Sequence, residues 1–274
     1  MDLNRTRTPA VFVGHCAAVL TTSSNDAAHQ FLACFAAELD AWRPRAIVVV
    51  SAHWMTDPVV MTGEGPLQTI HDHPSRALYD YRYPGHGSAE VAARLAEVLR
   101  HAGIDAATDR ARGLDHGAWV PLSLLRPRGD LPIVQLSLHA DATPPTHVAL
   151  GAALAPLRDE GVMLLGSGGI THNQEVFRRG YLAGADVATP EPFSRELDAW
   201  VSAIVTGTRG SERVRALTAI EEHPLARTAH PTLEHFLPLL VVAAAAGDDE
   251  GTKVFEGFQH SLSLSAFRFG KLGA

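Results

Sequence analysis

The sequence contains very little cysteine and no excess of positive charge, and each of these features excludes a class of protein. Only Cys16 and Cys34 occur among 274 residues, too few for a disulfide framework or a cysteine-rich zinc module. Charged residues make up 19% of the chain and the net charge is −7, which argues against a nucleic-acid or anionic-membrane partner. We therefore expect a globular protein in a reducing, cytoplasmic setting.

Long apolar runs are also missing, which argues against a membrane-spanning segment. The most apolar stretch, 237–246, has ten residues, whereas a helix that crosses a bilayer needs roughly 20. Near the N-terminus, Gly14 and His15 interrupt the apolar segment that follows Arg7, so we interpret that segment as a first strand and not as a signal peptide. No membrane partner is expected.

Several familiar catalytic motifs are absent as well. HPTLEH, residues 230–235, lacks the HExxH spacing of zinc proteases. Ser51 and Ser167 do not lie in a GxSxG elbow. GSGGITHN, residues 166–173, has neither the lysine of a P-loop nor the full GxGxxG spacing. These absences argue against zinc proteolysis, serine hydrolysis and nucleotide binding.

What the chain does have is a repeated pattern of a short apolar run followed by a histidine. The run 46–50 is continuous and rich in β-branched residues, as is typical of a strand buried on both faces of a parallel sheet. It leads to His53, and three similar runs lead to His15, His139 and His172. Because open α/β sheets bind ligands beyond the carboxyl ends of their strands, the pattern indicates an imidazole-lined site for a metal or for proton transfer.

Helical patterns alternate with these strands along the whole chain. Helices are expected over 27–42, 88–102, 146–158, 193–206, 211–219 and 237–246. The alternating tail 261–269 predicts an antiparallel edge strand, and the glycine-bounded segment 113–121 is expected to be a loop. Since there is no internal repeat or break in composition, we predict one α/β domain over 1–274, with a mixed, largely parallel sheet and helices on both faces.

Four histidines are the strongest candidates for chemistry. His15 and His53 each follow a strand, and neighbouring strands would bring both imidazoles to one ion. His172, in a glycine-rich turn, suits a general acid–base, and His116 is a second candidate for proton handling. For both of these residues an ordinary turn role is the alternative.

Two more histidines flank the start of the last apolar helix. His230 and His235 are five residues apart and do not share a helix face as an i, i+4 pair would. We expect at most one of them to bind a metal, and Glu234 is an alternative carboxylate ligand.

Segments along the whole chain resemble the class III extradiol ring-cleaving dioxygenases, specifically their 4,5-DOPA-dioxygenase-like branch. The matching segments are GH (14–15), IVVVSAHW (47–54), TIHD (69–72), ALYDYRYPGHG (77–87), LDHGAW (114–119), PIVQLSL (132–138), GSGGITHN (166–173), PTLEHFLPLL (231–240) and SLSLSAF (261–267). Their order and spacing are specific for the superfamily, which implies a single catalytic domain with its metal site at the carboxyl ends of the strands.

The resemblance also implies roles for individual residues. His15, His53 and His235 would be the metal ligands, His172 the acid–base and His116 a second active-site histidine. The substrates would be a catechol and O₂, and the product a muconic semialdehyde. Fe(II) would be needed for activity; Zn(II) could occupy the same site, but it has no redox chemistry.

The chain departs from the family pattern in two places near the expected substrate entrance. Cys16-Ala17-Ala18 replaces the usual Gly-Ser-Pro, and His73-Pro74-Ser75 replaces Phe-Gly-Gly. The irregular segment 63–87 predicts a functional loop, whose polar and aromatic side chains would suit a catechol bearing a carboxylate or an amine. The expected substrate-binding residues are His71, His73, Tyr79, Tyr83 and His230.

Three alternatives accompany this interpretation. A His-rich zinc site would also polarise water, as in a zinc-dependent hydrolase. A Memo-like metal- or ligand-binding protein of the same superfamily would bind without turnover. The loop residues could equally form an ordinary ordered surface, and the sequence is compatible with a homo-oligomer.

Overall fold

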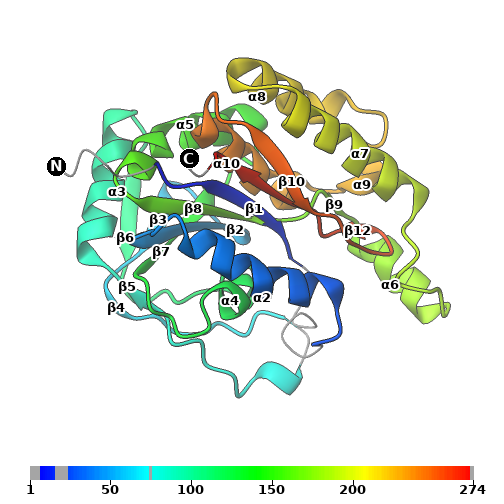
Figure 1. The fold of residues 1–274 in the computed structure, drawn as a ribbon, viewed down its shortest axis with the longest axis horizontal. Helices are drawn as coiled ribbons and strands as arrows, with labels where there is room; N and C mark the ends of the chain where they lie inside the picture. The colour runs from blue at the N-terminus through cyan, green and yellow to red at the C-terminus, as the bar shows by residue number, and fades with distance from the viewer. Residues whose placement is uncertain (1–6, 16–23, 74–75, 272–274) are drawn as a thin grey trace.

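An eight-stranded sheet lies at the centre of the molecule (Figure 1). The computed structural model describes residues 7–15, 24–73 and 76–271. In spatial order the strands are β10 (Gly251–Phe255), β13 (Ala266–Phe269), β1 (Ala10–Gly14), β8 (Val162–Gly168), β2 (Ala46–Thr56), β7 (Ile133–His139), β3 (Val59–Thr62) and β6 (Ala106–Asp109).

The sheet is mixed and largely parallel, as predicted. β1, β8, β2 and β7 run parallel to one another, whereas β13 is antiparallel to β1 and β10 is antiparallel to β13. Every residue of β1 and β8 is buried, because helices cover both faces of the central strands. The unbroken apolar runs in the sequence follow from this double coverage.

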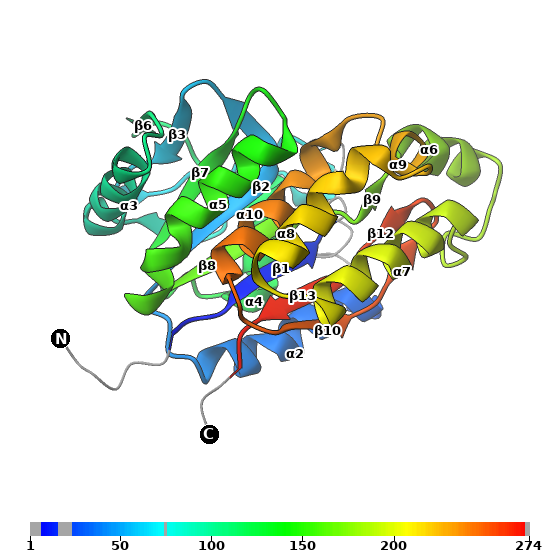
Figure 2. The ribbon, with the colours of Figure 1, turned by 90° about the horizontal axis from the view of Figure 1, so that it is seen from above.

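Helices pack on both faces of the sheet, which confirms the predicted fold class (Figure 2). One face carries α3 (Ala89–His101), α5 (Pro144–Asp159), α7 (Pro192–Gly207), α8 (Gly210–Thr218) and α10 (Leu237–Ala246). The other face carries α2 (Ala27–Asp40) and α4 (His116–Leu125). The remaining short helices are η1 (Arg76–Leu78), α6 (Gln174–Leu182), η2 (Ala219–Glu222), α9 (Ala226–Ala229) and η3 (Leu233–His235).

Local signals explain where the predicted helices begin and end. Asp26 caps α2 by accepting hydrogen bonds from the next backbone amides, and Ser88 caps α3 through Val91 N. Gly103 follows α3 with φ +73°, a left-handed conformation that glycine adopts without steric cost. In the part of the chain that the structure describes, no helix is long and apolar enough to cross a membrane.

Two predictions about individual segments were wrong, one fully and one in part. The segment 113–121 was expected to be a loop, but α4 begins at His116, with Asp115 as its cap. This helix is apolar around its whole circumference and buried, so it has no amphipathic pattern to find. The tail was expected to be an antiparallel edge strand. Its strand β13 is antiparallel to β1, but β10 pairs with the outer side of β13 and forms the edge.

Candidate functional site

Five imidazoles meet at the carboxyl ends of β1, β2 and β8, and we call them the histidine cluster. The ring centroids of His53 lie 5.0 Å from His15, 3.9 Å from His116 and 4.9 Å from His235. The ring of His172 stacks on that of His235 with 3.3 Å between centroids. The structure therefore brings together all five residues predicted to bind metal or to catalyse.

The glycines at the end of β8 position two members of the cluster. The Gly168 carbonyl accepts from the His15 backbone amide (2.8 Å), and the Gly169 amide donates to the His235 carbonyl (2.9 Å). A Cβ on Gly168 would collide with that carbonyl of His235. Gly168 lies in β8 and not in a turn, so these glycines allow backbones to approach closely and do not form a phosphate-binding loop.

His53 lies inside β2, whereas the sequence pattern placed it beyond the strand end. β2 continues to Thr56, and its pairing with β7 shifts register between Val50 and Met55. A bulge of this kind redirects side chains, and His53 lies within it. The Nε2 atoms of His53 and His15 are 2.9 Å apart.

His116 enters the cluster from the first position of α4. The Asp115 side chain accepts from Ala118 N and caps the helix. The next residue, Gly117, packs beneath the imidazoles: a Cβ there would lie 3.0 Å from both His15 Cε1 and His53 Cδ2. Because Gly117 has no side chain, the rings of His15 and His53 can approach this turn of α4 closely.

His172 occupies the short strand β9 (Thr171–His172), which pairs with β12 (Leu262–Ser263). The sequence placed this histidine in a glycine-rich turn, but the antiparallel pairing fixes its backbone. Gln174 Nε2 lies 3.1 Å from His172 Nε2. Because an amide NH₂ donates, the imidazole Nε2 is the acceptor and carries no proton.

Polar neighbours orient the rings of His15 and His235. His15 Nδ1 lies 2.8 Å from Ser167 Oγ, and His235 Nδ1 donates to Glu234 Oε1 at 2.9 Å. The latter contact places the proton of a neutral His235 on Nδ1. Its Nε2 is then a bare lone pair, and it is buried without a hydrogen-bond partner among the described residues.

A carboxylate orients His116 in the same way. Asp72 Oδ1 accepts from both the Nδ1 (2.9 Å) and the backbone amide (3.0 Å) of His116. Although burial opposes ionisation of Asp72, the hydrogen bonds and charge of His116 lower its pKa to about 2. Asp72 is therefore ionised at neutral pH. Because it contacts the Nδ1 of His116, the Nε2 on the other side of the ring is directed away from Asp72.

Burial lowers the pKa of four members of the cluster. Loss of solvation, followed by repulsion from the other imidazoles, holds the pKa of His15 and of His235 well below the usual value. Burial, then His116, lowers the pKa of His53 to about 4, and burial lowers the pKa of His172 to about 3. Neutral imidazoles are the form that binds metals.

These residues fit a metal ion. Nitrogen ligands bind zinc at about 2.0–2.1 Å, so two Nε2 atoms 2.9 Å apart are close enough to share one ion. Two sets of ligand atoms lie within 4.8 Å of one another: His15, His53 and His116, and His172, Glu234 and His235. His116 completes the set around His15 and His53, whereas the ring of His235 lies 5.6 Å from that of His15 and 4.9 Å from that of His53 between centroids.

The predicted substrate-binding residues divide into two groups. His73 lies beside the cluster, with its ring centroid 5.8 Å from that of His116, and Tyr79 follows at 5.9 Å from His73. The ring centroid of His71 lies 5.4 Å from that of Tyr79, and the two rings are tilted by 33°. Tyr83, in contrast, is 3% exposed in the core, where its hydroxyl donates to the Arg126 carbonyl.

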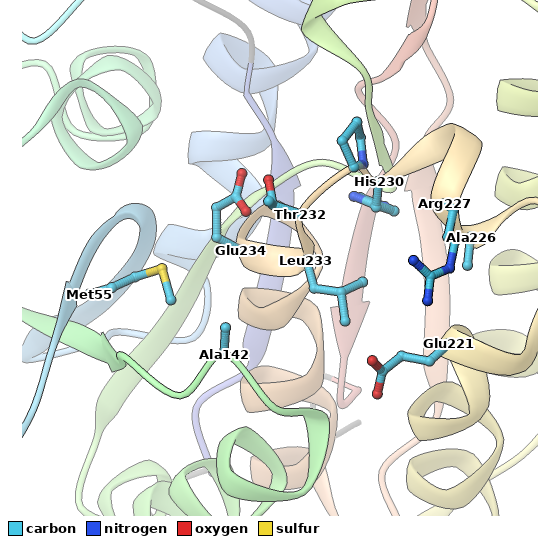
Figure 3. A pocket seen from close by; sticks show the side chains of 10 residues that line it. Met55, Ala142, Glu221, Ala226, Arg227, His230, Thr232, Leu233 and Glu234 are labelled. Carbon is cyan, nitrogen blue, oxygen red and sulfur yellow. The ribbon is translucent and has the colours of Figure 1, made fainter.

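His230 lines a cavity that Glu234 also lines (Figure 3). Its Nε2 is 2.8 Å from the Ile170 carbonyl, so this nitrogen donates, and its ring packs on Phe236. Burial lowers the pKa of His230 to about 4. The Cys16-Ala17-Ala18 departure, by contrast, lies outside the described residues.

Sequence reasoning missed the residues that hold the imidazoles. Asp72 was noted only as part of a matching segment, and no role was assigned to Ser167 or Gly117. A carboxylate next to His71 in TIHD gave no sign that it would contact His116, which lies 44 positions further along the chain. Only Glu234, adjacent to His235, was weighed as part of the site.

Comparisons with known proteins identify the family of the chain. The chain is 36% identical over 264 residues to a 4,5-DOPA dioxygenase extradiol of Beta vulgaris, covering 94% of this chain and 95% of that protein. It is 35% identical over 273 residues to a 4,5-DOPA dioxygenase extradiol of Escherichia coli, covering 98% and 97%.

A solved structure and a family description point the same way. The crystal structure of an uncharacterized Escherichia coli K12 protein superposes with a TM-score of 0.78 at 34% identity, covering 96% of this chain and 100% of that one. Residues 10–267 match the family described as the catalytic LigB subunit of aromatic ring-opening dioxygenase. The chain belongs to this LigB family of aromatic ring-opening dioxygenases.

Proposed function

We propose that the protein is an extradiol dioxygenase that opens a catecholic ring with O₂ to a muconic semialdehyde. The family is metal-dependent and its reaction takes a small aromatic substrate and O₂. The observation that carries the proposal is the convergence of five imidazoles, in which His235 Nε2 is buried and has no hydrogen-bond partner among the described residues.

His15, His53 and His235 would hold the metal. All three present Nε2 in a buried setting, and Ser167 and Glu234 fix the Nδ1 side of His15 and His235. Polar groups on the far nitrogen are the usual means of orienting a ligating imidazole. Fe(II) bound there would relay an electron between catechol and O₂, a step that Zn(II) cannot perform.

His172 would act as the acid–base. Its Nε2 now accepts from Gln174, and a catechol hydroxyl can replace that donor and transfer its proton to the same atom. Because burial keeps the imidazole unprotonated, it is ready to accept. A nearby catecholate charge would raise its pKa and hold the proton until it is returned to the substrate.

His116 and the adjoining loop would receive the substrate. Asp72 holds the Nδ1 proton of His116, so its Nε2 can accept a hydrogen bond from a substrate hydroxyl. His73, Tyr79 and His71 continue from His116 as a polar and aromatic wall. Rings of this kind can stack on a catechol and hydrogen-bond to its oxygen atoms.

Anaerobic reconstitution with Fe(II), followed by a panel of catechols and air, tests the proposal. We expect O₂ uptake and a yellow ring-fission product, with both oxygen atoms of O₂ incorporated into it. Tight catechol binding without O₂ uptake would instead identify a binding protein. Water-dependent cleavage of an ester or amide by the zinc form would identify a hydrolase. Either result would overturn the proposal.

A further inference from the structure

Three buried serines alternate with leucines in the tail segment SLSLSAF, which lies outside the histidine cluster. Ser261, Ser263 and Ser265 are each 0% exposed. The two leucines between them belong to the apolar core that also contains α2 and α4, which leaves the serine hydroxyls on the opposite face of the extended chain. Because buried hydroxyls need hydrogen-bond partners, the contacts of these serines show what the tail holds in place.

The tail holds the backbone on both sides of His172. Strands β12 and β9 lie side by side (Figure 1), and they pair antiparallel. On one side of the histidine, the Thr171 hydroxyl accepts from the Ser263 backbone amide (2.9 Å) and donates to the Ser261 carbonyl (2.9 Å). On the other side, the Asn173 carbonyl accepts from the Ser261 hydroxyl at 2.8 Å. The place of the His172 backbone is therefore set by the tail.

A buried carboxylate on α7 anchors the tail. Asp198 is 1% exposed, and its Oδ1 accepts from the Ser263 hydroxyl at 2.7 Å. Its Oδ2 accepts from Lys253 Nζ, on β10, at 2.5 Å. A carboxylate that is removed from water loses solvation energy, and paired contacts of this kind must offset the loss. Asp198 thus links α7 and β10 to β12, and through β12 to β9.

The side-chain contacts of His172 cannot replace this anchor during a reaction. Its Nε2 contacts the side chain of the exposed Gln174, which a catechol hydroxyl would displace. Its ring stacks on His235, which would bind the metal. Both contacts are expected to change when metal and substrate bind, whereas the contacts of the backbone with the tail lie outside the cluster and can persist.

We propose that Asp198 and Ser263 are positioning residues for His172. The hydrogen bond between them holds β12 against α7, and β12 in turn fixes β9 and the direction in which the imidazole faces the substrate. The contact from Ser263 to Thr171 runs through a backbone amide, so the network positions the histidine and does not carry its proton. This inference rests on the proposed function, in which His172 is the acid–base.

Two substitutions remove the hydrogen bond from its opposite ends. Asp198→Ala and Ser263→Ala should each lower kcat about 10–100-fold, because a displacement of about 1 Å is enough to cost that much in a proton transfer. KM and metal content should stay within about twofold of the wild type. Since both variants lose the same bond, the double variant should be about as active as the slower single variant.

A conservative variant and a matched control separate positioning from general damage. Asp198→Asn retains an oxygen acceptor for Ser263 and should recover most of the kcat lost in Asp198→Ala. Lys253 also contacts Glu256, so it keeps a partner in both Asp198 variants. Ser265→Ala removes another buried hydroxyl from the same tail, but this Oγ has no hydrogen-bond partner among the described residues.

The control should therefore keep the kcat of the wild type. A loss in Ser265→Ala as large as that in Ser263→Ala would overturn the proposal. So would a wild-type kcat in Ser263→Ala, or an Asp198→Asn variant as slow as Asp198→Ala.

Hydrogen–deuterium exchange of the metal-free protein makes the test independent of turnover. In Ser263→Ala, peptides that contain 171–173 and 261–263 should exchange roughly tenfold faster than in the wild type, whereas peptides from α5 should not change. Such local loosening supports the anchor even if the iron-loaded wild type opens no catechol and the proposed function fails. Unchanged exchange in these peptides, or equal acceleration in α5, would refute the anchor while leaving the proposed function standing.

Discussion

Two histidine sites lie at the same end of the sheet, and only one of them resembles a metal centre. His53 in β2 and His139 at the end of the neighbouring strand β7 both follow apolar runs. The nitrogens of His139 face carboxylates, Asp57 at 3.5 Å and Asp141 at 3.3 Å. His53 instead faces the Nε2 of another imidazole at 2.9 Å.

The difference shows which surroundings make a histidine available as a ligand. Near β7, His147 accepts from the His139 backbone amide and also contacts the Thr143 carbonyl, so both of its nitrogens have protein partners. In the cluster, His235 retains a bare Nε2. Neutral imidazole rings that are held close together, with lone pairs that have no hydrogen-bond donor, favour the binding of a metal cation.

The largest difference in metal binding is expected between the variants that lack His53 and His139. His53→Ala should lose bound metal and all ring cleavage, because two remaining protein ligands hold an ion weakly. His139→Ala should retain both. Metal content after Fe(II) reconstitution, measured by mass spectrometry on folded protein, checks this. Stoichiometric metal in His53→Ala would contradict the assignment.

The same measurement of metal content distinguishes His235 from His116 as the third ligand. His235→Ala should lose the metal, whereas His116→Ala should retain it and lose substrate affinity. The reverse outcome would make His116 the ligand, completing the set formed with His15 and His53.

Removing the proposed acid–base should affect turnover more than metal binding. His172→Ala is expected to keep its metal and to lose roughly 10²–10⁴-fold in kcat, the usual contribution of a positioned proton-transfer group. Single-turnover kinetics on the iron-loaded variant measure this. A rate equal to that of the wild type would show that another group transfers the proton.

A smaller effect on metal affinity is expected from substituting Gly117, which leaves room for the rings of His15 and His53. Gly117→Ala places a Cβ 2.3 Å from Ser51 Oγ and 3.0 Å from the rings of His15 and His53, so these side chains must shift and metal affinity should fall about 10–100-fold. Gly207→Ala, at the end of α7 with no atom within 4 Å of the added Cβ, is the matched control. Equal affinities for the two variants would show that the rings tolerate the change.

The smallest effect is expected in the pH dependence of the metal-free protein. Histidines whose pKa is lowered on folding bind fewer protons than they do in the unfolded chain, where the pKa is about 6.5. The free energy of unfolding should therefore decrease as pH falls from about 6.5 toward 4, the pKa of His53. The slope is about 1.4 kcal/mol per pH unit for each such histidine.

Urea unfolding across this range measures that slope. His53→Gln should reduce it, because the variant lacks one of the histidines whose pKa is lowered on folding. A slope that is the same in His53→Gln as in the wild type would mean that other groups control acid stability.

The fold could be predicted well because its strands are buried on both faces. Unbroken runs such as 46–50 and 162–165 identify parallel strands with little ambiguity, and Ser88 and Gly103 mark the limits of one helix. The prediction failed at α4, where Gly117 and Pro121 look like loop residues. There the burial of an entire helix outweighs local propensity.

The sequence predicted which histidines lie together, but not how their rings are arranged. Strand ends indicated His15 and His53, and the start of the last apolar helix offered His230 or His235, between which the family resemblance selected His235. The sequence could not show that His139 would turn to Asp57 and Asp141, since a register shift within β2 decides which side chains meet. Contacts across long separations, such as that between Asp72 and His116, leave no local pattern.

A crystal structure of the protein loaded anaerobically with Fe(II) tests the central claim most directly. We predict one ion within about 2.0–2.3 Å of the Nε2 atoms of His15, His53 and His235, with the His139 site empty. An ion bound at His139 and Asp141, or no ion touching His15 and His53, would contradict the proposed centre.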